Sequence, residues 1–429
     1  MKKRTFLKLS STLLTTAAIA SCVQKTPPGK NWAGNIEYSS DQTYEPATID
    51  ELRSIIQGHD HIKAQGTCHS FNTIADSTYG FVRLTKLNQV VSLDEANMTV
   101  TVQAGIRYGE LCKYLESKGY ALHNLASLPH ISVGGSIATA THGSGVKNQN
   151  LSSAVRSMKI MNAAGEIIDL PGDLSVHLGA LGVVTEVTLA IQPTYQVRQF
   201  VYQHLPMSSL KDHFMEIMSA GYSVSLFTDW SNDINQVWVK KTVAEGDAPA
   251  ELFGATAATK DLHPIESISA VNCTPQMGVP GPWHERLPHF KLDFTPSAGE
   301  ELQAEYFVPL ANGYDAIEAV YALREKITPL LQISEVRTIA SDGLLMSPMH
   351  GRDTLAIHFT WKKDWDGVRN VLPLIEETLS KFDVRPHWGK LFTIDPEVLQ
   401  GSYRDDLAKF SKLTDGKFIN EFLQKNLLS

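Results

Sequence analysis

Residues 124–145 read NLASLPHISVGGSIATATHGSG. These 22 residues hold four glycines and six serines or threonines, but no aspartate, glutamate, lysine or arginine. Glycine lets the main chain approach a ligand closely, and small hydroxyl side chains add hydrogen-bond donors without bulk. The stretch therefore predicts a backbone surface packed against a large ligand. The alternative is a glycine-rich buried turn, which any protein that mixes helices and strands can contain.

A second stretch repeats this composition. Residues 64–76 read AQGTCHSFNTIAD and combine a glycine turn, small hydroxyl residues and one imidazole, that of His69. Two such stretches in one chain favour a ligand cradle over a chance buried turn.

Length and composition indicate a globular protein of two domains. The chain has 429 residues, too many for one ordinary core, with 43% hydrophobic and 20% charged residues. No internal repeat interrupts it.

The first 21 residues predict a signal peptide. Lys2, Lys3, Arg4 and Lys8 flank an apolar run that ends in small residues and is shorter than the roughly 20 residues a membrane-spanning helix needs. Residues 3–8 resemble a twin-arginine export signal with lysine in place of the first arginine.

Residues 19–22, IASC, resemble a bacterial lipobox, so we expect an exported periplasmic or cell-surface lipoprotein anchored at Cys22, with residues 22–30 as a tether. Removal of residues 1–21 changes the net charge from −8 to −12, which excludes an ordinary nucleic-acid binder. Cys68, Cys112 and Cys273 have the spacing of neither a disulfide framework nor a metal site.

Local patterns predict the secondary structure of the first half of the chain. Thr48 and Glu51 have the spacing of a helix capping box. The helix of residues 108–118 places Cys112 in the core. Strands are expected at 61–64, 90–93, 98–102, 158–161, 166–170 and 186–191.

Two strands further along carry polar residues on one face. In residues 355–361, LAIHFTW, the apolar residues alternate with His358 and Thr360. In residues 333–339, ISEVRTI, Glu335 and Arg337 project from the same face. These pairs indicate either a solvated sheet face or a sheet whose polar face covers a ligand.

Five runs together resemble the vanillyl-alcohol-oxidase class of FAD-dependent oxidases, and within it the alditol (xylitol, sorbitol) oxidases. The runs are GTCHSFN at 66–72, ASLPHISVGG at 126–135, THGSG at 141–145, GALGVVT at 179–185 and HWGK at 387–390. The resemblance covers the chain from about residue 31 to its carboxyl end.

The resemblance implies an α+β fold: a two-part FAD-binding domain of the PCMH type with an inserted α+β substrate, or cap, domain. The expected boundaries are 31–195 for the FAD-binding domain, 196–385 for the cap and 386–429 for a carboxyl-terminal return to the flavin. The break near 195 agrees with a gain in tryptophan, because five of the seven tryptophans lie within 196–385.

Site residues follow from the same resemblance, position by position. His69 would carry the flavin covalently, His387 would lie near its ring, and the residues lining FAD would be Ala64, Gln65, Gly66, Thr67, Cys68, Ser70, Ser127, Ser132, Gly135, Thr139, Ala140, Thr141, His142 and Val184. The substrate would meet Ser127, Glu335, Arg337, Thr360 and Lys390. The strand pattern adds His358. No metal is expected.

One position departs from the family pattern. Relatives have glycine before the histidine, whereas this chain has Cys68. If the position needs a left-handed backbone, cysteine strains it by about 1–2 kcal/mol.

The implied reaction is oxidation of the C1 primary alcohol of an alditol to an aldose, with reduction of O2 to H2O2. Arg337 and Lys390 would favour the developing alkoxide, and Lys390 or His358 would take the hydroxyl proton. The expected partners are a polyol and O2 or another electron acceptor, and the protein is expected to be a monomer. The alternatives are a sugar-lactone oxidase, a polyol dehydrogenase of the same superfamily, and a lipoprotein that binds sugars without turnover.

Overall fold

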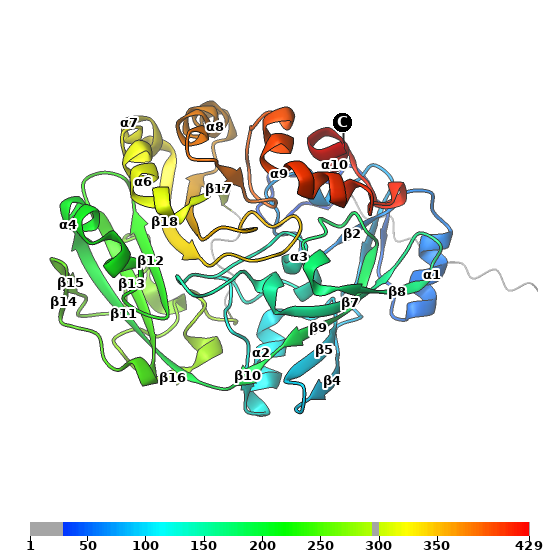
Figure 1. The fold of residues 1–429 in the computed structure, drawn as a ribbon, viewed down its shortest axis with the longest axis horizontal. Helices are drawn as coiled ribbons and strands as arrows, with labels where there is room; N and C mark the ends of the chain where they lie inside the picture. The colour runs from blue at the N-terminus through cyan, green and yellow to red at the C-terminus, as the bar shows by residue number, and fades with distance from the viewer. Residues whose placement is uncertain (1–28, 294–299, 429) are drawn as a thin grey trace, which may run out of the picture.

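The structure is a computed structural model that describes residues 29–293 and 300–428 (Figure 1). The expected signal peptide, lipobox and Cys22 lie outside these ranges. In the two described ranges, no helix has both the length and the apolar character needed to cross a membrane.

The amino-terminal part holds three small sheets. A parallel sheet has the order β1 (Thr43–Tyr44), β3 (Phe81–Arg83), β2 (Lys63–Gln65). An antiparallel sheet has the order β4 (Val90–Asp94), β5 (Thr99–Gln103), β9 (Val183–Ala190), β7 (Val155–Met161), β8 (Ile167–Pro171). A short pair joins β6 (Tyr120–Ala121) to β10 (Gln192–Pro193).

The second half of the chain builds a larger, antiparallel sheet. Its order is β14 (Glu251–Leu252), β15 (Ala255–Ala257), β11 (Gln196–Leu205), β13 (Ile234–Thr242), β12 (Ser223–Thr228), β18 (Leu331–Ile339), β19 (Thr354–Lys362), β17 (Glu301–Pro309), β20 (Arg385–Pro386), with β16 (Gly281–Pro282) paired to β11.

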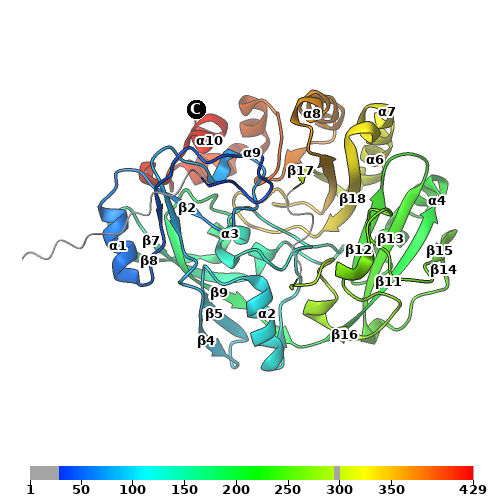
Figure 2. The same cartoon turned by 180° about the vertical axis from the view of Figure 1, so that it is seen from behind.

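Helices cover these sheets: α1 (Ile49–Gln57), α2 (Tyr108–Ser117), α3 (Val133–Ile137), α4 (Met207–Asp212), α5 (Phe214–Met218), α6 (Gly313–Tyr321), α7 (Arg324–Ile327), α8 (Trp365–Ser380), α9 (Pro396–Ser411) and α10 (Glu421–Leu423). Figures 1 and 2 show α6, α7 and α8 in a row along the large sheet, continued by α9 and α10 toward β2. The fold is α+β, as the sequence predicted.

Apolar and polar residues alternate along the central strands of the large sheet, which explains why the helices cover only one of its faces. Leu355, Ile357, Phe359 and Trp361 of β19 are fully buried and pack in one hydrophobic cluster with residues of α6 and α8. The opposite face of the same strand carries His358 and Thr360. Because the helices occupy the apolar face, the polar face is left for a cavity.

Most local predictions from the sequence are confirmed. Thr48 caps α1 by accepting the Glu51 N–H at 3.2 Å, and Cys112 of α2 is buried in the core. β7 and β8 correspond to the strands expected at 158–161 and 166–170, and they pair as an antiparallel hairpin. The strand expected at 186–191 begins three residues earlier, at Val183 of β9, because the valines of the GALGVVT run already pair with β7.

Candidate active site

A cavity of about 760 Å³ lies between the amino-terminal loops and the polar face of the large sheet. One wall comes from residues 63–71, 126–142 and 177–184, and the other from β17, β18 and β19 with the loop at 387–390. The two glycine-containing stretches singled out in the sequence therefore face one cavity.

The two stretches also touch each other. A Cβ added to Gly66 would lie 3.0 Å from Gly135 Cα and 2.9 Å from Ser132 Oγ, so only glycine permits this backbone approach. Ser132 Oγ is buried and has no hydrogen-bond partner among the described residues. The contact forms a cradle with a polar atom left for a ligand.

Nearly all residues predicted to line a cofactor border the cavity: Ala64, Gln65, Gly66, Thr67, Cys68, His69, Ser70, Ser127, Ser132, Gly135, Thr139, Thr141, His142, Val184 and His387. Ala140 is the exception: it does not border the cavity, and its side chain is buried in the core with a backbone φ of +54°.

Cys68 has a left-handed backbone, with φ of +60°. A cysteine with this backbone conformation is strained, as the sequence analysis expected for a left-handed position. Its sulfur lies 3.8 Å from the Gly66 carbonyl and 3.9 Å from Gln65 Oε1, contacts too weak to offset that strain.

His69 is the imidazole that the cradle presents. Its Nδ1 lies 3.0 Å from Thr67 Oγ1, and its ring stacks on Trp32 with centroids 5.4 Å apart. Burial, and after it the positive charge of Lys390, lowers the pKa of His69 to about 4. The ring is therefore neutral at pH 7 and keeps one nitrogen lone pair.

Asn72 fastens the carboxyl-terminal loop to this stretch. Its amide donates to the carbonyls of Trp388, at 2.8 Å, and Lys390, at 2.7 Å, while Phe71 N–H donates to the Gly389 carbonyl at 2.8 Å. These bonds hold His387 and Lys390 beside the His69 loop, although the two segments are more than 300 residues apart.

The register of the large sheet places three titratable residues in a row. Glu305 of β17 pairs with His358 of β19, and His358 pairs with Glu335 of β18. Glu335 and Arg337 are each only 6% exposed, so they do not form a solvated face. Of the alternatives left by the sequence, the polar face that covers a cavity is the correct one.

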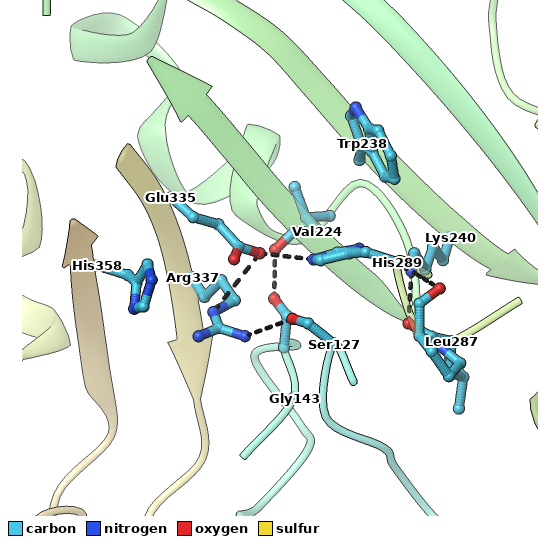
Figure 3. A network of polar contacts seen from close by, with 12 residues as sticks. Ser127, Gly143, Val224, Trp238, Lys240, Leu287, His289, Glu335, Arg337 and His358 are labelled. Carbon is cyan, nitrogen blue, oxygen red and sulfur yellow. Dashed lines mark hydrogen bonds and ion pairs between the residues drawn. The ribbon is translucent and has the colours of Figure 1, made fainter. Parts of the chain in front are cut away.

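Arg337 contacts Glu335 and Ser127 (Figure 3) and also reaches across the row to Glu305. Its guanidinium lies 2.8 Å from Glu305 Oε1, 3.6 Å from Glu335 Oε1 and 3.3 Å from Ser127 Oγ. Nε is the guanidinium atom that faces Glu335, and it makes an ion pair there without the geometry of a hydrogen bond.

The two carboxylates stay ionised in spite of their burial. Burial alone would raise the pKa of Glu335, but Arg337 and His289 outweigh it and hold the pKa well below its ordinary value. Burial opposes ionisation of Glu305 too, and His142, Arg337 and His358 lower its pKa. The site thus holds fixed negative charge that can accept hydroxyl hydrogens.

Lys390 and His358 are the basic groups of the cavity. Burial lowers the pKa of Lys390 to about 8 even though Glu305 and Glu301 act against it. Lys390 donates to Gln303 Oε1 and lies 4.8 Å from the centre of the Phe71 ring. Burial also lowers the pKa of His358. Its Nδ1 lies 3.3 Å from Glu305 Oε2, but the two atoms are not aligned for a hydrogen bond. Its Nε2 lies 3.3 Å from Thr360 Oγ1.

Glu305 is the main residue that the sequence analysis missed. A period-two signal was present, since Glu301, Gln303 and Glu305 alternate with apolar residues along β17 and all border the cavity. The ligand atoms of His142, Glu305 and His387 lie within 4.8 Å of one another, which is close enough to hold a metal ion. Glu305 is already paired with Arg337, so the geometry favours an ion pair there over a metal site.

The chain is similar to known proteins over the segments that form this cavity. The FAD binding domain family matches residues 40–171, and the D-arabinono-1,4-lactone oxidase family matches residues 299–426. An alditol oxidase from Streptomyces sp. (strain IKD472 / FERM P-14339) is 46% identical over 413 residues, which cover 92% of this chain and 97% of that protein.

More distant proteins also align over most of the chain. An L-gulono-1,4-lactone dehydrogenase from Mycobacterium tuberculosis is 27% identical over 85% of this chain and 90% of its own. The crystal structure of cholesterol oxidase from B. sterolicum superposes with a TM-score of 0.75 at 16% identity, covering 93% of this chain and 96% of that one. This last likeness shows the fold alone.

Proposed function

Because the chain belongs to the alditol oxidase family of FAD-dependent oxidoreductases, we propose that it oxidises the C1 primary alcohol of an alditol such as xylitol or sorbitol. The products are an aldose and, with O2 as acceptor, H2O2. The observation that carries the proposal is one cavity with two unlike walls, a glycine cradle on one side and a charged sheet face on the other.

The cradle has features that suit FAD. A flavin nucleotide needs close backbone contact and hydrogen-bond partners for its polar groups, and both are available here. Gly66 and Gly135 leave the backbone uncovered. Ser132 Oγ and His177 Nε2 border the cavity as buried atoms without a partner among the described residues.

His69 is proposed as a covalent attachment point for FAD, through the 8α-methyl group. The low pKa of His69 and the contact of its Nδ1 with Thr67 support a neutral imidazole that can act as a nucleophile. A C–N bond forms as the imidazole N–H and one methyl C–H are lost, and the two hydrogens reduce one O2 to H2O2.

The opposite wall would bind the polyol. Glu335 accepts hydroxyl hydrogens, Ser127 and Thr360 add neutral hydroxyl partners, and Arg337 adds a positive charge. Because these groups are buried, an analogue that lacks one hydroxyl leaves a polar atom unpaired and is rejected strongly. This discrimination favours a linear polyol over a phenol or a bulky apolar alcohol.

The pKa values favour His358 over Lys390 as the base. At pH 7 Lys390, with a pKa of about 8, is still mostly charged, whereas His358 is mostly neutral. Nδ1 of His358 faces Glu305, so Nε2 is the atom that takes the hydroxyl proton. Lys390 and Arg337 stabilise the developing alkoxide. FAD supplies the acceptor for the hydride that leaves C1.

The test is an anaerobic substrate screen that follows bleaching of the flavin absorbance. Xylitol, sorbitol and other alditols should bleach it, and a later addition of air should restore it with release of H2O2. If a sugar lactone bleaches the flavin and no alditol does, the polyol assignment is wrong.

A second candidate is oxidation of a sugar lactone, or transfer of electrons to another acceptor. The match of residues 299–426 to the D-arabinono-1,4-lactone oxidase family favours it, because β17, β18 and β19 lie in that segment. The same screen separates these possibilities, since a dehydrogenase stays bleached in air and recovers with an added dye. A colourless purified protein would instead indicate a sugar-binding protein without turnover.

We also propose that the protein is an exported lipoprotein anchored at Cys22, on the lipobox-like residues 19–22. Mass spectrometry of membrane-derived protein should then show a diacylglyceryl group on Cys22. A soluble mature protein that begins at another residue would contradict this.

A further inference from the structure

Two buried residues behind the substrate wall, Lys240 and His289, have no part in the chemistry described above. Lys240 is 1% exposed and His289 5% exposed. Figure 3 shows His289 between Lys240 and Glu335, with Arg337 beyond. A buried lysine is rare in proteins unless it has partners, so its contacts are informative.

Every partner of Lys240 accepts hydrogen bonds. Nζ contacts the carbonyl oxygens of Leu287 and Pro288, and it lies 3.2 Å from Nδ1 of His289. An ammonium group has three hydrogens and no lone pair, and these partners use all three. Nδ1 of His289 must then be the unprotonated nitrogen of the ring.

Because Nδ1 of His289 is unprotonated, the state of the other ring nitrogen, Nε2, is also determined. A neutral imidazole without a proton on Nδ1 carries it on Nε2, which lies 2.8 Å from Glu335 Oε1 and donates to it. Burial, and then Lys240, lowers the pKa of His289 to about 4, which agrees with a neutral ring. Trp238 and Phe227 meet the ring edge-on, with centroids 5.2 and 5.5 Å away, and limit its rotation.

His289 also holds a second substrate residue through its backbone. Its N–H donates to the Ser127 carbonyl at 3.2 Å. Ser127 Oγ in turn lies 3.3 Å from Arg337, and Arg337 lies 3.6 Å from Glu335. His289, Glu335, Arg337 and Ser127 therefore form a closed ring of polar contacts.

We propose that His289 is a positioning residue that orients Glu335 and Ser127 for the hydroxyl groups of the substrate, and that Lys240 keeps Nδ1 of His289 unprotonated. This rests on the function proposed above. Without Lys240, Nδ1 loses the donor that occupies its lone pair and the neighbouring positive charge, so the ring can take up a second proton there. Nε2 keeps its proton in either case, because the carboxylate of Glu335 only accepts hydrogen bonds.

The first experiment reads the tautomer and needs no substrate. Protein labelled with 15N-histidine is compared by NMR with Lys240→Met at about pH 6, where the ammonium form of Lys240 dominates because its pKa is about 7. We expect His289 in the wild type to be protonated on Nε2 only, and His289 in Lys240→Met to be protonated on both ring nitrogens. A wild-type His289 protonated on Nδ1 overturns the proposal, whether or not alditols are oxidised.

The second experiment separates KM from kcat with an alditol. Loss of a charge-assisted hydrogen bond to Glu335 should raise KM about tenfold in His289→Leu, with kcat within about threefold of the wild type. Lys240→Met keeps this bond and should keep a KM within about threefold of the wild type. His289→Gln should restore KM, because its amide nitrogen can replace Nε2 as the donor. FAD content should be unchanged in all three variants.

Trp238→Phe serves as the matched packing control. It alters a ring that contacts His289 but removes no hydrogen bond to Glu335, and its KM should stay within about threefold of the wild type. If His289→Leu binds FAD and keeps the wild-type KM, or if His289→Gln is as impaired as His289→Leu, His289 does not position the substrate residues.

Discussion

The guanidinium of Arg337 reaches over strand β19 to the carboxylate of Glu305, 2.8 Å away. Arg337 stands on β18 and Glu305 on β17, and β19 lies between them. The β19 residue that pairs with Arg337 is Ala356, whose methyl group leaves room above the strand. The ion pair between Arg337 and Glu305 thus depends on the small size of Ala356, although Ala356 takes no part in the pair itself.

Glu305→Gln should destabilise the protein by about 3 kcal/mol, because Arg337 and His142 lose the carboxylate nearest to them inside a buried site. Urea unfolding at pH 7 measures this. Glu376→Gln is the matched control: Glu376 is also buried, but its carboxylate bonds to the hydroxyl of Tyr306 and to Thr393 and faces no cation. Equal losses for both variants would contradict the importance of the ion pair.

His69→Ala should abolish covalent attachment of FAD while leaving weaker binding in the cradle. After acid precipitation, yellow colour should stay with the wild-type polypeptide and pass to the supernatant for the variant. His61→Ala, which removes a partly exposed imidazole outside the cavity, should keep the colour with the pellet. Complete release of flavin from the wild type would exclude the bond.

Lys390→Met should lower kcat about a hundredfold, since it removes one cation from the developing alkoxide. FAD content should change little, because Asn72 holds this loop through the backbone carbonyl of Lys390. Stopped-flow reduction of the flavin, with absorbance for FAD content, checks both. A large loss of FAD with a normal rate per flavin would assign Lys390 to cofactor binding.

The rate should depend on pH in a bell shape. Neutral His358 is the active form, so kcat/KM falls as the pH drops below its pKa, which burial holds under the ordinary 6.5. Charged Lys390 is the active form, so kcat/KM also falls as the pH rises through about 8. The alkaline limb should disappear in Lys390→Met. A profile that rises through pH 8 would make Lys390 the base.

Cys68→Gly should stabilise the protein. Relief of a left-handed cysteine gains about 1–2 kcal/mol, and the added freedom of glycine in the unfolded chain costs about 0.5–1 kcal/mol, so the net gain is about 0–1.5 kcal/mol. Cys112→Gly should do the opposite, because Cys112 is buried in a helix. Urea unfolding compares the three proteins, and a Cys68→Gly variant less stable than the wild type would show that the sulfur contacts dominate.

The sequence predicted the parts of the site that depend on local periodicity. Alternation along β18 and β19 placed Glu335 with Arg337 and His358 with Thr360, and the structure keeps both pairs together. The α+β fold was predicted from the family motifs rather than from periodicity.

The residues that were missed depend on tertiary contacts. Lys240 lies within an apolar strand and bonds to carbonyls of a loop 47 residues away, which no local pattern reveals. Ala140 was assigned to the cofactor site by the resemblance to the family, but it has a positive φ and its side chain is buried in the core. A backbone reversal of this kind in a non-glycine residue is not visible in a local sequence pattern.

The bond between Asn72 and the Lys390 carbonyl joins residues 318 positions apart, which has a consequence for biosynthesis. A ribosome makes the cradle loop early, but the loop that closes over it is among the last segments to leave. The nascent amino-terminal half can therefore hold at most a partial site, and capture of the cofactor must wait until translation is nearly finished. A chain truncated before residue 386 would keep every cradle residue and still lack the loop that secures them.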